Sequence, residues 1–135
     1  MKEILTYIIE NLFFMPFLIG IIFVITALIM LRFPPKKINY LYGYRTTTSM
    51  KNQEVWNFSQ KYSSIKMIQS GFFLVAFSFL GAIFQPDELL QLIVGIALSI
   101  LVCLFLFFTT EKAIKKREKA EKEAKTAQKK QKEFE

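Results

Sequence analysis

The side chains best suited to bind a ligand are concentrated in one segment of the chain, between Pro34 and Trp56. Arg45 stands out there, because its planar guanidinium can bind a lipid phosphate, a carboxylate or several carbonyls at helix ends. Glycine, proline, asparagine and tyrosine residues surround it. The candidate binding residues are Pro34, Pro35, Asn39, Tyr42, Gly43, Tyr44, Arg45, Thr46, Ser49, Asn52 and Trp56.

Arg45 has two interpretations, and the sequence does not choose between them. It either recognises a ligand or ties an irregular loop to the ends of neighbouring helices. For Asn39 and Asn52 the structural role is the commoner one, because asparagine stabilises turns and helix ends through its own side chain.

Catalytic chemistry finds little support in the sequence. The chain has no histidine, and its one cysteine, Cys103, lies in the middle of an apolar run. Without histidine the usual pairing of nucleophile and base cannot be assembled. Asp87 and Glu88 are adjacent, but neither metal-ligand spacing nor a glycine-rich phosphate loop accompanies them. We therefore expect no enzymatic activity, no metal site and no cofactor.

The elements that must position the candidate residues are apolar segments. These run from about 12 to 31, from 67 to 84 and from 89 to 110, and none contains a charged residue. A helix of about 20 residues spans the hydrocarbon core of a bilayer. The link at 85–88 contains Pro86 and is so short that it forces an antiparallel helical hairpin. The sequence therefore predicts an all-α, polytopic membrane protein with three transmembrane helices.

The basic residues indicate how these helices are oriented. Of the 18 Lys and Arg residues, seven lie between Arg32 and Lys66 and ten lie after Glu111. Basic residues accumulate on the cytoplasmic side of membrane proteins, so we predict the N-terminus outside and the C-terminus inside a bacterial plasma membrane. Both basic clusters adjoin apolar segments, which argues against nucleic acid as the reason for the net charge of +7.

The tail, residues 111–135, is rich in Lys, Glu and Ala and contains neither Gly nor Pro. It is predicted to extend the third span as a cytoplasmic helix, stabilised by the i, i+4 pairs Glu111–Lys115, Glu118–Lys122 and Glu121–Lys125. Its apolar positions are too few for a coiled coil. We favour a solvated helix beside anionic lipid headgroups over a protein-docking arm.

The loop of residues 32–66 is predicted to end in a helix. Ser49 or Asn52 can cap a helix that begins near Met50 or Gln53. This helix either lies on the inner membrane surface or continues directly into the second span. Trp56 is suited to the headgroup level.

These loop residues resemble a known family. Pro34-Pro35 with Asn39, then Gly43-Tyr44-Arg45-Thr46, Ser49, Asn52 and Trp56 are similar, in order and spacing, to the signature of the SdpI family. These are bacterial membrane proteins whose namesake gives immunity to a secreted toxic peptide. The resemblance implies that residues 1–110 form a minimal three-span domain of this kind. Where the family usually has Ala followed by Asn or His, this chain has Ser59 and Gln60.

The resemblance implies an immunity-type membrane protein that protects the cell against a secreted toxic or antimicrobial peptide. One alternative is a scaffold or signalling protein that recruits a cytoplasmic partner such as a transcriptional repressor. Another is a binder of lipid headgroups that uses Arg45. The expected partners are anionic lipids, the toxic peptide or a cytoplasmic regulator, and three short spans bury so little surface that a homo-oligomer is also compatible with the sequence.

Overall fold

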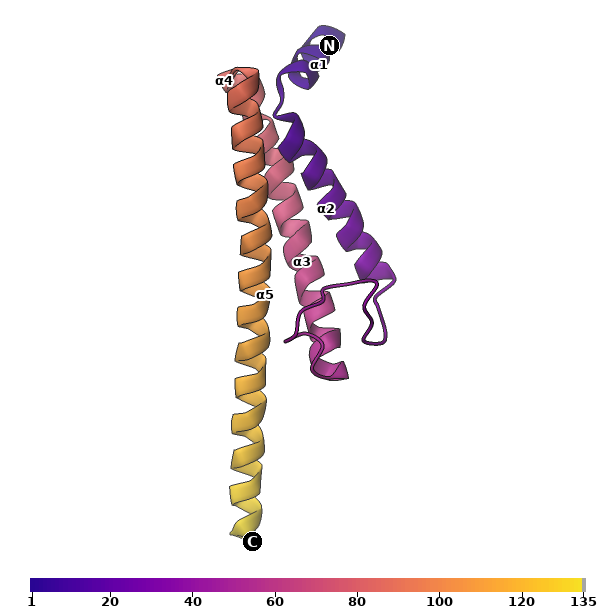
Figure 1. Cartoon of the computed structure of the whole chain (residues 1–135), viewed down its shortest axis with the longest axis vertical. Coiled ribbons are helices and arrows are strands. Elements are labelled where there is room, and N and C mark those ends of the chain that lie inside the picture. Colours follow the sequence, from indigo (N-terminus) through magenta and orange to yellow (C-terminus); the bar gives the residue numbers. More distant parts are fainter. Residues whose placement is uncertain (135) are drawn as a thin grey trace.

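The computed structural model describes residues 1–134, and helices account for most of that part of the chain, without a strand. Figure 1 shows long helices running side by side, with the irregular loop at one end of the bundle. In chain order the helices of residues 1–134 are α1 (Lys2–Asn11), α2 (Phe14–Arg32), α3 (Gln53–Ser78), α4 (Leu80–Phe84) and α5 (Glu88–Glu133). We call the end that holds residues 33–52 the loop end, and the end that holds residues 85–87 the hairpin end.

The three predicted apolar spans are confirmed as helices long and apolar enough to cross a membrane. The first begins at Phe14 rather than at residue 12, because the chain bends at Leu12 and Phe13, whose side chains are buried. Pro16 lies in the first turn of α2, where its missing N–H leaves no hydrogen bond unmade. The sequence analysis did not predict α1, which precedes this bend.

The helix that follows the loop continues directly into the second span. It begins at Gln53, and the Asn52 side chain caps it by accepting a hydrogen bond from the Val55 N–H at 2.9 Å. Of the two predicted arrangements, the continuous helix is therefore the one that the structure shows. The predicted span does not run unbroken to Phe84, because α3 ends at Ser78 and the short α4 follows.

The closest helix contact lies between α2 and α3, at Gly20 and Gly71. A Cβ atom built on either glycine would lie 2.7 Å from the backbone oxygen of the other. Only glycine allows two helix backbones to approach so closely, as in small-residue helix pairs in membranes. Gly95 of α5 also lies close to α2, because a Cβ there would lie 2.9 Å from the Cβ of Met15.

Helix α5 contains both the third span and the tail. Figure 1 shows its final turns extending beyond the loop end of the other helices. The close ion pairs within residues 111–134 are Arg117–Glu121 and Lys119–Glu123, so none of the three predicted pairs is in close contact there, although the charge of Lys115 acts on Glu111. Ile114 is fully buried, whereas residues 122–134 are exposed throughout. The first turns of the tail thus belong to the folded domain and are not fully solvated.

Candidate functional site

The site is built on the two prolines that end α2. Pro35 is buried, and its carbonyl oxygen accepts a hydrogen bond from the Trp56 indole N–H at 2.6 Å. Trp56 itself is 0% exposed. The prediction that Trp56 lies at the headgroup level is therefore wrong, because its N–H group is satisfied inside the protein by the backbone of the loop.

Asn39 organises the first turn of the loop. Its side-chain oxygen accepts hydrogen bonds from the backbone N–H groups of Leu41 and Tyr42, at 3.0 and 2.9 Å. Its side-chain N–H donates to the Lys37 carbonyl, and the Tyr42 hydroxyl donates to the Phe33 carbonyl at 2.8 Å. Asn39 and Asn52 thus both act on the backbone, which confirms their structural role.

The next turn passes through Gly43, whose φ of +106° favours glycine over any other residue. A Cβ at this position would also collide with the side chain of Gln60. The Gln60 amide accepts a hydrogen bond from the Tyr44 N–H and donates one to the Tyr44 carbonyl. A side chain of α3 therefore satisfies both backbone groups of Tyr44, as a neighbouring strand would.

Thr46 and Ser49 close the loop through bonds between their hydroxyl groups and the backbone. The Thr46 N–H donates to Ser49 Oγ at 2.8 Å, and the Ser49 N–H donates to Thr46 Oγ1 at 3.1 Å. Ser49 is fully buried. This pair holds the backbone of residues 46–49 in a compact turn.

Glu111 of α5 ties this turn to the tail. Its carboxylate accepts hydrogen bonds from the hydroxyls of Thr46, at 2.7 Å, and of Tyr44, at 3.0 Å. Partial burial by itself raises the pKa of Glu111, but these donors and the charge of Lys115 outweigh it and leave the pKa below its ordinary value. Burial, with the nearby carboxylate, raises the pKa of Tyr44. Glu111 is thus held ionised beyond the end of the third span.

Two further ion pairs join the tail to the end of the loop and to the first turn of α3. Lys51 lies 3.0 Å from Glu118, and Glu54 in the first turn of α3 lies 2.8 Å from Arg117. The Arg117 guanidinium also lies over the Phe58 ring, 4.8 Å from its centre. Each of these exposed contacts contributes little alone, but together they fix the tail beside α3.

Arg45 differs from its neighbours because its side chain is exposed. Its guanidinium makes no hydrogen bond or ion pair with any residue in the range 1–134. The interpretation in which Arg45 ties the loop to the span ends is therefore not what the structure shows. Its donors remain available to a ligand.

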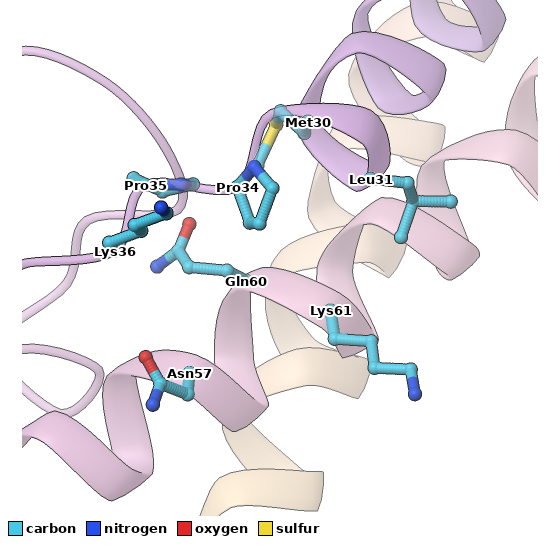
Figure 2. Close-up of a pocket in the computed structure, with 8 residues that line it drawn as sticks. All are labelled: Met30, Leu31, Pro34, Pro35, Lys36, Asn57, Gln60 and Lys61. Atoms are coloured by element: carbon cyan, nitrogen blue, oxygen red, sulfur yellow. The ribbon is translucent and has the colours of Figure 1, made fainter.

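A cavity of about 470 Å³ lies beneath the loop, between the end of α2 and the first turns of α3. Figure 2 shows the Gln60 amide directed toward the two prolines, while the Lys61 ammonium extends away from them. The lining residues are Met30, Leu31, Pro34, Pro35, Lys36, Asn57, Gln60 and Lys61. Of the predicted binding residues, only Pro34 and Pro35 line it. The others form the loop itself.

The sequence analysis missed two residues of this site, Gln60 and Glu111. Glu111 lies outside the motif, on α5, and Gln60 lies on α3 at a position where the sequence departs from the family pattern. A signal for each was present: Gln60 is a polar residue on the face that also carries Trp56, and Glu111 is the first charged residue after a long apolar run.

Comparison with known proteins agrees with this assignment of the loop. Residues 36–109 match the SdpI/YfhL protein family. The chain is 39% identical over 97 residues to a protein of Bacillus subtilis (strain 168) named "Uncharacterized protein YfhL", and the match covers 71% of this chain and 82% of that protein. No solved structure matches the chain significantly. This chain belongs to the SdpI/YfhL protein family.

Proposed function

We propose that this protein is an immunity-type membrane protein that protects a bacterial cell against a secreted toxic or antimicrobial peptide. The observation that carries the proposal is the family match, which covers the loop from residue 36 and the two spans after it. The folded loop supports it, because most of the signature residues take part in hydrogen bonds that hold the loop to itself, to α3 and to α5.

The proposal includes an orientation, with the loop end in the cytoplasm and the hairpin end outside. The loop end carries nearly all the basic residues, and the hairpin end carries Asp87 and Glu88. The positive-inside rule then places α1 and α4 on the outer side. A labelling experiment tests this: in a Cys103→Ser background, Glu88→Cys should react with an impermeant thiol reagent in intact cells, and Lys125→Cys should react only after lysis.

This orientation determines where a secreted peptide would make contact. The outer surface consists of α1, α4 and the hairpin link. Here the Tyr7 hydroxyl donates a hydrogen bond to the Ala82 carbonyl at 3.1 Å, which holds α1 beside α4. We therefore place toxin contact on these elements and on the spans, while the inner loop supports the fold, lipid binding or signalling.

The test of immunity is a killing curve. Expression of the chain in a sensitive host should raise its tolerance to the toxic peptide, and Gln60→Ala, which breaks the loop network, should reduce the protection. Protein levels in the membrane must be matched by immunoblot. Unchanged killing curves at matched levels would overturn the proposal.

A scaffold or signalling function is the second candidate, favoured by the exposed helix of residues 122–134. A cytoplasmic partner, such as a transcriptional repressor, could dock there without disturbing the loop. Deletion of residues 122–135 should remove such a partner from a crosslinked pull-down and leave the loop-to-tail contacts intact. If the recovered proteins do not change, the tail is not a docking arm.

The third candidate, a binder of lipid headgroups, rests on the exposed guanidinium of Arg45. Arg45→Lys keeps the charge but loses the planar fork that binds a phosphate through two donors. Lipid retention should fall in this variant, and retention equal to that of the unchanged protein would count against the idea.

A further inference from the structure

Two hollows lie along the seam between α3 and α5. The first, of about 410 Å³, is apolar and is lined by Gln69, Ser70, Phe73, Leu98, Leu101, Val102 and Phe105. The second, of about 550 Å³, lies toward the loop end. It is lined by Phe58, Tyr62, Thr109, Lys112, Ala113, Lys116, Arg117 and Ala120.

The two hollows follow one stripe of each helix. On α5 their residues recur at spacings of three and four, from Leu98 through Phe105 and Thr109 to Lys116. On α3 the same face carries Tyr62 in the basic hollow and Gln69 in the apolar one. Residues at this spacing line one side of a helix. The two hollows therefore lie in line along one seam, which we call the α3–α5 groove, and Figure 1 shows these two helices alongside each other.

The groove is apolar at one end and basic at the other, which matches the apolar chain and the charged headgroup of an amphiphile. Its apolar part lies within the third span, whereas its other part begins where that span ends at Thr109 and contains three basic residues. Arg117 is already paired with Glu54 and Glu121. Lys112 and Lys116, one turn apart, are both exposed and form no ion pair with residues 1–134.

A third cation lies where the two parts meet. The Lys66 ammonium lies 5.7 Å from the centre of the Tyr62 ring and donates a hydrogen bond to Gln69 Oε1 at 3.1 Å. Its position between Tyr62 and Gln69 adds positive charge at the boundary of the apolar part. A monoanionic group bound at the boundary between the two parts would face cations from both α3 and α5.

We propose that the α3–α5 groove binds an anionic phospholipid, with an acyl chain in the apolar part and the phosphate held by Lys112 and Lys116. This site is distinct from Arg45, which lies on the loop. It also goes beyond the proposed immunity function, because lipid binding here requires no peptide.

The test is native mass spectrometry of the full chain, purified from membranes and exchanged into nanodiscs of phosphatidylglycerol or phosphatidylcholine. The full chain should retain phosphatidylglycerol preferentially. The double substitution Lys112→Gln and Lys116→Gln should reduce this retention by about thirtyfold, the loss expected for two lysines near an anionic surface. The matched control is Lys125→Gln with Lys129→Gln, which removes two exposed lysines at the same spacing on the same helix.

A second variant tests the apolar part. Leu101→Trp fills the apolar hollow without changing charge, and it should also lower phosphatidylglycerol retention. Glycerol phosphate, which has no acyl chain, should not compete with the lipid. Equal loss in the two lysine variants, or no loss in either, would overturn the proposal. Competition by glycerol phosphate, or full retention in Leu101→Trp, would overturn its acyl-chain part and leave a phosphate site alone.

Discussion

The Gln60 side chain pairs with both backbone polar groups of Tyr44, accepting from its N–H at 2.6 Å and donating to its carbonyl at 2.8 Å. Gln60 is 3% exposed, so these bonds lie inside the protein. One side chain on α3 thus determines the path of the loop at the centre of the family signature.

Gln60→Ala should lower the stability of the fold by about 2 kcal/mol, because it leaves the Tyr44 N–H without a partner and removes one of the two hydrogen bonds to the Tyr44 carbonyl, which also accepts from Ser49 Oγ. The measurement is the midpoint of thermal unfolding in detergent. Gln69→Ala is the matched control, since Gln69 is an exposed glutamine on the same helix. If both variants unfold at the temperature of the unchanged protein, Gln60 does not hold the loop.

Gly20→Ala and Gly71→Ala should each destabilise the protein, by about 1–3 kcal/mol, because the new Cβ forces α2 and α3 apart. The effect should appear as a lower unfolding temperature. Ala76→Val adds bulk to an exposed position of α3 and serves as the control. If the control variant loses as much stability as the glycine variants, the close approach of α2 and α3 does not depend on Gly20 and Gly71.

Trp56 is the only tryptophan in the chain and reports on its own burial. Its fluorescence should be nearly insensitive to acrylamide in the folded protein, because the ring has no contact with solvent. The reference is a variant with Trp56→Phe and Tyr40→Trp, which places the indole where the native side chain is 81% exposed. Comparable quenching of the two proteins would contradict the buried position.

The contact between the loop and Glu111 should depend on pH. The pKa of Glu111 is lower in the folded protein than its ordinary value, so its ionised form contributes stability above that value. This contribution is lost as the pH falls through the lowered pKa of the folded state. Unfolding temperatures measured from neutral to acidic pH should show an advantage of the unchanged protein over Glu111→Gln that disappears in acid. An advantage that persists at low pH would contradict the assignment.

The tail should divide into a structural part and a dispensable part. Deletion of residues 122–135 should leave the unfolding temperature unchanged, because the side chains of residues 122–134 are exposed. Deletion of residues 112–135 should lower it, because it removes buried Ile114 and the ion pairs of Arg117 and Glu118. If both truncated proteins unfold at the same temperature, this division of the tail is wrong.

Most of the predicted loop residues hold the loop in shape, but the residues on the helices that support it were not predicted. Asn39, Gly43, Ser49 and Asn52 could be assigned from the sequence, because turns and caps depend on residues a few positions apart. Gln60 and Glu111 act on residues 16 and 65 positions earlier in the chain, and no local pattern indicates such a distance.

The sequence by itself determined the three apolar helices, the hairpin between the last two and the family of the loop. These follow from length, apolar composition and short spacings, which act along the chain. Only the tertiary structure decided that Trp56 is buried, that Arg45 is left exposed, and that Glu111 ties the tail to the loop. The physical reason is that each depends on which helix faces lie together, and the approach of α2 to α3 at Gly20 and Gly71 sets that arrangement.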